Sequence, residues 1–509
     1  MITRKNKIKL SIWDLLICIS AGIHAFVNLY NIAGPIADWH AFRQTQTAIS
    51  IRSYIQNGWS LFYETPIVGK PWMIPMEFPL YQSIVYAVHQ VFSGSLEVEA
   101  RAISLFFFYA SLFLIYRLLR IVFSMPERIA KLGIVGILAS SYYLFWADAI
   151  LIENLGLFLA ISASLCAYFF LSEQKGALWG ILLLFLSTAL ILSKVTTYVG
   201  VFAPFFAIIF FQNSDWKNVL CRSNRRLVFM AIGMLAINYV AIRLWVDACD
   251  VIKNENPLAR SWTSASLETW NFGTLKQRLS FDIWVHYFKG LGHYNPIFWI
   301  ASAVMCCWNA WSNKGVWKVN CLLLLVMLSG PLVFFNLYKV HTYYDIPNNW
   351  ALIILFTYNA IMLCESFRLY RRIRIVLSVL IVSAFVYFGG YRRFVYTGYD
   401  AKFIARHENK YEPLESFSES LGPGVVISFA NKLSSAYPYH MNRHFIIIPK
   451  NASPELMADI LTRNSQETLI AVLYDPLDEP VFISMDSLAH DLGLEGFLSL
   501  GFDGLSVRY

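Results

Sequence analysis

The chain has 509 residues, of which 57% are hydrophobic and 15% charged, and its mean hydropathy is +0.50. Soluble domains carry about 25% charged residues, so this composition excludes an ordinary cytosolic enzyme. Residues 1–390 carry 31 basic and 18 acidic residues, a net charge of +13, whereas residues 391–509 carry 10 and 15, a net charge of −5. The sequence therefore predicts a basic membrane part followed by an acidic, water-soluble domain, and this layout argues against an all-membrane channel or a simple carrier with no extramembrane domain.

Apolar runs in the first part are long enough to cross a bilayer, which requires about 20 residues. Four basic residues within 1–10 precede the first run, and no clean cleavage site follows it, so we expect an uncleaved anchor with a cytoplasmic N-terminus. About eleven spans are expected, at 11–33, 101–123, 129–147, 150–171, 177–193, 197–212, 227–246, 295–312, 319–337, 350–366 and 374–390.

Basic residues support this topology, because Lys and Arg accumulate in cytoplasmic loops. They recur in the loops predicted to be cytoplasmic, most densely within 117–131, 217–226 and 368–374. An odd number of spans then places residues 391–509 outside the cytoplasm. The net charge of +8 therefore reflects the basic residues of the cytoplasmic loops and does not indicate nucleic-acid binding.

Three outer segments are too long to be simple turns: 34–100, 247–294 and the tail, 391–509. The first contains 79–92, an apolar stretch better suited to a helix at the membrane interface than to a span. In the tail, 425–429, 444–448 and 469–474 have the composition of strands, and Ser453 followed by Pro454 predicts a helix start. The expected fold is mainly α: a polytopic helix bundle, interfacial helices in the first outer loop, and a small C-terminal α/β extracytoplasmic domain.

Ionisable residues near membrane depth are costly and often mark functional sites. The run 38–47 offers Asp38, His40 and Arg43 within six residues, with Gln44 beside them, and Glu77 lies near the end of the same loop. A hydrated loop with a helix start would also explain this run. We take Asp38 and Glu77 as candidate catalytic carboxylates, and His40, Arg43 and Gln44 as candidate donor-binding residues.

A second set of polar residues lies at the ends of later spans, on the same predicted side. Its candidate donor-binding members are Lys194, Arg243, His341, Tyr343 and Tyr344, and its secondary members are Asp148 and Glu153. Each residue alone is typical of an interface anchor. Together they suit a reaction on a lipid-phosphate substrate, because cations bind a phosphate and a carboxylate transfers a proton.

Other chemistries have little support in the sequence. It contains no phosphate-binding glycine loop, no Gly-x-Ser-x-Gly elbow and no His-Glu-x-x-His motif. The eight cysteines show no zinc-ligand spacing, and no Asp-x-Asp pair lies in the first outer loop. We therefore expect no cofactor, and a divalent metal ion is unsupported.

The run 38–47 followed by Gly58, the run 76–81 and Arg101 together resemble the polytopic glycosyltransferases of the type-C fold. Within that fold, these motifs are similar to those of a bacterial, family 39-like group that includes protein O-mannosyltransferases and the lipid A aminoarabinose transferase. Bacterial relatives show a similar His-x-x-Arg-Gln-x-x-Thr-Ala run, a similar Glu-Phe-Pro-Leu-Tyr run and a late His-x-Tyr-Tyr motif, which 341–344 resembles here. The likeness covers about the first 125 residues well and the rest by layout.

This resemblance implies a sugar donor on a polyprenyl phosphate and a reaction at the outer face of the bacterial inner membrane. Asp38 would be the general base and the transfer would invert the anomeric carbon; Arg43, Lys194 or His341 would stabilise the leaving phosphate, and Glu77 would orient acceptor or sugar. The chain has Glu77-Phe78-Pro79 where the aminoarabinose-transferase type has Lys-Pro-Pro, and Asp38-Trp39 where O-mannosyltransferases have Asp-Glu. The phosphate-binding lysine of the former is therefore not carried over.

The expected activity is thus a hexosyl or pentosyl transfer to a cell-envelope glycolipid, polysaccharide or protein. Two alternatives remain: an O-antigen-type polymerase or ligase, and a transporter or flippase of lipid-linked sugars. The tail would either stabilise the outer loops or recognise the acceptor, and nothing in the sequence decides between these two roles.

Overall fold

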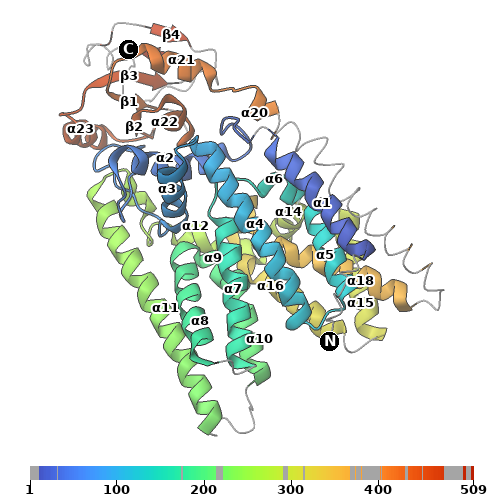
Figure 1. Ribbon diagram of the computed structural model, residues 1–509. Coiled ribbons are helices and arrows are strands. Elements are labelled where there is room, and N and C mark those ends of the chain that lie inside the picture. The colour runs from blue at the N-terminus through green and yellow to red at the C-terminus, as the bar shows by residue number, and fades with distance from the viewer. Residues whose placement is uncertain are drawn as a thin grey trace, which may run out of the picture.

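The computed structural model describes residues 11–30, 32–172, 176–213, 222–290, 296–312, 316–366, 404–429, 434–449, 451–474, 497–499 and 506–508, together with 373, 376, 380, 402 and 494. A bundle of long helices forms one part of the molecule, and a small sheet with its helices covers one end of that bundle (Figure 1). The fold class expected from the sequence is therefore confirmed.

The helices of the bundle correspond to ten of the eleven expected spans. They are α1 (Ile12–Leu29), α4 (Leu96–Ile121), α5 (Glu127–Ala139) with α6 (Ser141–Trp146), α7 (Glu153–Leu171), α8 (Gly176–Ser193), α9 (Val195–Thr197) with η1 (Tyr198–Phe202) and α10 (Ala203–Asn213), α11 (Arg222–Glu255), α15 (Pro296–Ser312), α16 (Val316–Val333) and α18 (Asn349–Ser366). The eleventh, 374–390, lies almost wholly outside the described residues.

Seven helices in the described part of the chain are long and apolar enough to cross a membrane, and a shorter apolar helix covers 349–365. The chain is therefore a multi-pass membrane protein, although the count of eleven spans is not confirmed. Two boundaries differ from expectation. The span expected at 129–147 is broken at Ser140, which separates α5 from α6, and α11 continues to Glu255, beyond the expected end at 246.

The first outer loop contains two helices, α2 (Ala41–Asn57) and α3 (Leu80–Phe92). The helix expected at 79–92 is thus confirmed, and its interfacial position stays a prediction. Although α2 is rich in polar residues, most of its side chains are buried, because it contacts both the bundle and α22 (Ala436–Met441) of the tail (Figure 1). The side chain of Thr45, for example, is hydrogen-bonded to Ser435 at 2.9 Å.

After the end of α11, the described part of the second outer segment contains four short helices: η3 (Ala259–Trp262), α12 (Glu268–Phe272), α13 (Leu275–Leu279) and α14 (Phe281–Gly290). Two further short elements, α17 (Phe335–Val340) and η5 (Thr342–Asp345), follow α16. Trp270 of α12 contacts His341 between α17 and η5, with ring centroids 6.0 Å apart. These short helices therefore border the same region as the polar residues of the first outer loop.

In the described part of the tail, the strands form a five-stranded sheet in the order β2-β1-β3-β5-β4. Its elements are α20 (Ala405–His407), α21 (Glu412–Ser420), β1 (Val425–Ser428), α22, β2 (His444–Ile447), α23 (Pro454–Arg463), β3 (Leu469–Tyr474), β4 (Phe497–Ser499) and β5 (Ser506–Arg508). Strands β2, β1 and β3 are parallel, and β5 and β4 are antiparallel. The three expected strands and the helix capped by Ser453, whose side chain accepts a hydrogen bond from Leu456 N, are confirmed.

The first outer loop adds to this sheet at its β2 edge. Phe445 N donates to Pro66 O at 3.0 Å, and Ile447 N donates to Ile67 O at 2.9 Å. An exposed sheet edge presents unpaired backbone groups, and the loop satisfies them here. The tail is therefore attached to the first outer loop by backbone hydrogen bonds as well as by side chains.

Candidate active site

Asp38 lies immediately before α2 and is only 4% exposed. Its Oδ1 accepts a hydrogen bond from Gln44 Nε2 at 2.5 Å, and its Oδ2 accepts one from Arg406 Nε at 2.8 Å. The loop that leads to Asp38 is held by buried Arg101 of α4, which donates to the backbone oxygens of Ile32 and Gly34. Both the backbone and the carboxylate of Asp38 are therefore fixed by contacts from distant parts of the chain.

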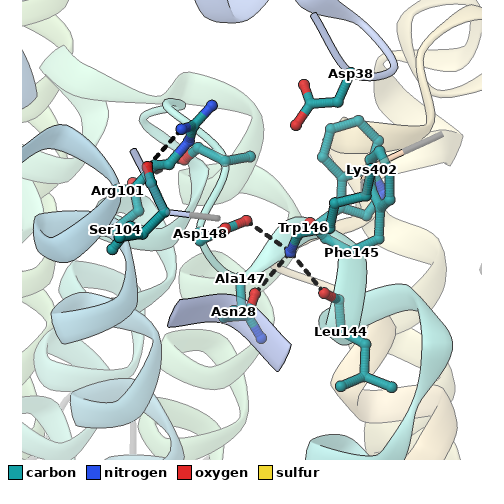
Figure 2. A network of polar contacts seen from close by, with 12 residues as sticks. Asn28, Asp38, Arg101, Ser104, Leu144, Phe145, Trp146, Ala147, Asp148 and Lys402 are labelled. Carbon is teal, nitrogen blue, oxygen red and sulfur yellow. Dashed lines mark hydrogen bonds and ion pairs between the residues drawn. The ribbon is translucent and has the colours of Figure 1, made fainter. Parts of the chain in front are cut away.

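Asp148 lies in the turn between α6 and α7 and is fully buried. It accepts hydrogen bonds from Arg406 Nη1 at 2.7 Å and from Lys402 Nζ at 2.9 Å. Lys402 Nζ also donates to Asn28 Oδ1 and to Leu144 O, each at 2.8 Å, so that it connects α1, α6 and the turn (Figure 2). We call Asp38, Asp148, Lys402 and Arg406 the carboxylate network.

The charges in this network influence one another strongly. Burial would raise the pKa of Asp148, but Arg406 and Lys402 outweigh it, so the pKa lies below its ordinary value. Burial lowers the pKa of Lys402 to about 8, although Asp148 acts in the opposite direction. Opposite charges within a few ångströms favour the charged forms, and the buried carboxylate Asp148 thus remains ionised near neutral pH.

A second group of charges lies beside α2. Arg43 Nη2 is 2.5 Å from Glu77 Oε1, and Lys194 Nζ is 3.9 Å from the same oxygen and 2.7 Å from Glu153 Oε1. Burial would raise the pKa of Glu77, but Arg43 and Lys194 lower it below its ordinary value. Arg43, Glu77, Glu153 and Lys194, which we call the cation cluster, place two buried cations beside the partly exposed carboxylate of Glu77 and the fully buried carboxylate of Glu153.

Aromatic rings line the same region. His40 adopts a left-handed conformation, with φ of 58°, that is uncommon outside glycine, and its ring lies 5.9 Å from that of His341 and 5.4 Å from that of Tyr343. Lys194 Nζ lies 4.4 Å from the centre of the Tyr344 ring, in cation–π contact. Burial, with Arg43 and Lys194 nearby, lowers the pKa of His341 to about 4, so its imidazole is neutral at pH 7 and suited to hydrogen bonding.

The structure brings nearly all the residues singled out in the sequence into these two neighbouring groups. Asp38, Gln44 and Asp148 belong to the first, and the remaining members lie in or beside the second: His40, Arg43, Glu77, Glu153, Lys194, His341, Tyr343 and Tyr344. Arg243 is the exception. It lies on α11, is paired with Asp247 at 2.8 Å, and both side chains are more than half exposed.

Sequence reasoning missed Lys402 and Arg406, which come from the segment counted as part of the water-soluble tail. A basic pair at a four-residue spacing would share one face if the segment were helical, and this is the signal in the sequence that could have identified them. Within the described ranges, no group of three or more His, Cys, Asp or Glu residues is arranged to hold a metal ion.

Neither a protein-family model nor a curated protein matches this sequence. Solved structures do match. ArnT from Cupriavidus metallidurans, bound to undecaprenyl phosphate, is 11% identical over 97% of both chains, with a TM-score of 0.56. The archaeal oligosaccharyltransferase AglB from Archaeoglobus fulgidus, in complex with an inhibitory peptide and a dolichol-phosphate, is 11% identical over 91% of this chain and 69% of its own, with a TM-score of 0.52. Together with the helical bundle and the C-terminal sheet, these likenesses identify the chain as a polytopic membrane protein of the type-C glycosyltransferase fold.

Proposed function

We propose that this protein is a membrane glycosyltransferase that moves a sugar from a polyprenyl-phosphate donor to a cell-envelope acceptor. The observation that carries the proposal is the cation cluster, in which Arg43 and Lys194 both approach Glu77 Oε1. Buried cations bind phosphate oxygens through charge-assisted hydrogen bonds. The two neighbours described above share the fold and are bound to undecaprenyl phosphate and to a dolichol-phosphate.

In the proposed reaction, Asp38 takes the proton of an acceptor hydroxyl while that oxygen attacks the anomeric carbon of the sugar. The bond between this carbon and the phosphate oxygen breaks, and its electron pair leaves with the lipid phosphate, so the configuration inverts. Arg43 and Lys194 stabilise the negative charge that develops on the phosphate. Neutral His341 donates a hydrogen bond to the leaving phosphate. Glu77, which is fixed by Arg43, orients a hydroxyl of the sugar or of the acceptor.

Binding of the lipid phosphate provides the first test. Native mass spectrometry of the purified protein with undecaprenyl phosphate, and with undecaprenol as the matched lipid without phosphate, separates recognition of the head group from general lipid binding. The proposal requires retention of the phosphate form at concentrations where undecaprenol dissociates. Equal retention of both lipids, or no transfer from any polyprenyl-phosphate sugar in proteoliposomes, would exclude the proposed activity.

Arg43→Ala should weaken undecaprenyl phosphate binding about 10- to 100-fold, because a hydrogen bond to a charged group contributes about 1.5–3 kcal/mol. The measurement is the dissociation constant in detergent. Arg243→Ala is the matched control: it removes an arginine that is 52% exposed and paired with Asp247, and should leave the constant unchanged. If only the Arg243 variant bound the lipid more weakly, the phosphate site would lie at α11 and not at the cation cluster.

We also propose that residues 1–390 are the transferase module and that 391–509 form an extracytoplasmic domain, with the N-terminus in the cytoplasm of a bacterial cell. The distribution of basic residues in the loops supports this orientation. Alkaline phosphatase fused at Tyr509 should be active and green fluorescent protein at the same position dark, whereas fusions after Glu127 should show the opposite pattern. An active phosphatase at Glu127 together with an inactive one at Tyr509 would mean that the topology is the inverse of the proposed one.

A further inference from the structure

The carboxylate network contains two cations from a segment that follows the last expected span. Arg406 lies 368 residues from Asp38 and 258 from Asp148 in the chain, and Lys402 lies 254 residues from Asp148. Both cations are buried, with exposures of 0% for Lys402 and 3% for Arg406. Desolvating a charged side chain costs several kcal/mol unless paired charges compensate it. The burial of both cations is therefore a specific feature of this site that requires an explanation.

Arg406 contacts both carboxylates at once. Its Nε and Nη2 lie 2.8 and 2.7 Å from Asp38 Oδ2, and its Nη1 lies 2.7 Å from Asp148 Oδ2. A guanidinium presents its donors in a rigid plane, whereas an ammonium is a point charge. A single arginine can therefore fix the distance and orientation of two carboxylates in a way that a lysine cannot.

Lys402 fixes the other side of this arrangement. It anchors Asp148 to Asn28 of α1 and to the backbone of α6 (Figure 2). Gln44, whose Oε1 accepts a hydrogen bond from Ile150 N at 3.1 Å, joins Asp38 to the same turn. Asp38 is thus enclosed by contacts with the bundle and with the tail, and Arg406 is the contact from the tail.

We propose that Arg406 is a positioning residue: it orients Asp38 against Asp148, and transfer requires that Arg406 and Lys402 keep their contacts with these two carboxylates. This inference rests on the proposed role of Asp38 as the base. It assigns the start of the tail a part in the reaction that neither the stabilising role nor the acceptor-recognition role includes. The cation cluster contains no tail residue, so donor binding does not depend on Arg406.

The test compares Arg406→Gln and Arg406→Lys with Arg463→Gln, which removes an arginine of α23 that is 40% exposed and paired with Asp459. Purified variants are measured for kcat, KM of the donor, undecaprenyl phosphate binding and the pH profile of kcat. We expect Arg406→Gln to lower kcat about 100-fold, in the range of lost acid–base catalysis, with the dissociation constant within twofold of wild type.

The pH profile distinguishes positioning from a structural role. Arg406 contributes most to the lowering of the Asp148 pKa, and without it only Lys402 and Arg101 act in that direction. Asp148 then retains its proton to higher pH, so the acid limb of kcat should move up by about one pH unit. Arg406→Lys keeps the charge and should leave the acid limb in place, with only partial recovery of kcat because one ammonium cannot orient both carboxylates.

Three outcomes would overturn the inference: an unchanged kcat in Arg406→Gln, an unchanged acid limb with a reduced kcat, or parallel losses of kcat and lipid binding in Arg406→Lys. If Arg406→Gln does not fold, Arg406→Lys carries the test, because full recovery of kcat by the lysine would exclude a role for the arginine plane. Failure of the proposed function is different: the wild type itself would transfer no sugar or would not bind undecaprenyl phosphate.

Discussion

Replacing Asp38 by Asn should lower kcat about 10²- to 10⁴-fold, the range in which a positioned acid or base contributes to catalysis. Asparagine is nearly isosteric and can still accept a hydrogen bond from Gln44 or Arg406, which contact Asp38 in the wild type. It cannot accept a proton from the acceptor. Undecaprenyl phosphate binding should stay within a few-fold of wild type, because Asp38 lies outside the cation cluster. Steady-state transfer in proteoliposomes, with donor and acceptor varied separately, measures both quantities.

Glu77→Gln is the matched comparison, because Glu77 is the other carboxylate proposed for catalysis and its side chain is 25% exposed. If Glu77 only orients the substrate, its loss should change KM and kcat less than the loss of Asp38 and should leave the acid limb of the pH profile in place. A loss of more than 100-fold in Glu77→Gln, with Asp38→Asn nearly as active as wild type, would assign the base to Glu77.

Most elements of this fold could be predicted from the sequence, because their signals are local. Long apolar runs marked the helices of the bundle, and runs such as 469–474 marked strands. The extension of α11 to Glu255 was not predicted, because hydropathy marks the end of an apolar run, whereas a helix can continue through the polar residues beyond it. The break at Ser140 lies inside an apolar run that contains no proline to indicate it. The helix α2 is polar in sequence but buried in the structure, because the bundle covers one side and the tail the other.

The candidate site was predicted in its composition more than in its arrangement. Asp38 and Asp148 were recognised separately, as members of two different sets. Their connection runs through Arg406, and no pattern within either segment indicates a contact over 258 or 368 residues. A net charge of −5 in 391–509 suggested a water-soluble domain. Because a net charge sums over the whole segment, it gave no indication that two cations near its start are buried. Arg243 was predicted to belong to the site but lies outside it. Its position at the end of a span does not reveal which way its side chain points.

Asp148→Ala should lower the free energy of unfolding by about 3–5 kcal/mol, the cost of removing one partner from a buried ion pair. Its carboxylate is fully buried and bound to Lys402 and Arg406, so both cations would lose their main neutralising group. The measurement is the thermal unfolding midpoint in detergent, without substrate. Asp247→Ala is the control: it removes a carboxylate that is 58% exposed and paired with Arg243 on α11, and such exposed pairs contribute about 0–1 kcal/mol.

The pH dependence of this destabilisation provides an independent check. Burial already lowers the pKa of Lys402 to about 8 in the folded protein, below the value of about 10.4 for an exposed lysine. Removal of Asp148 takes away the group that opposes this shift, so the folded protein releases the proton of Lys402 at lower pH than before. In that range the unfolded chain binds more protons, and stability rises with pH. The deficit of Asp148→Ala relative to wild type should therefore shrink as the pH is raised from 6 to 8, whereas that of Asp247→Ala should stay constant; a constant deficit in both would mean that Lys402 keeps its proton through another partner.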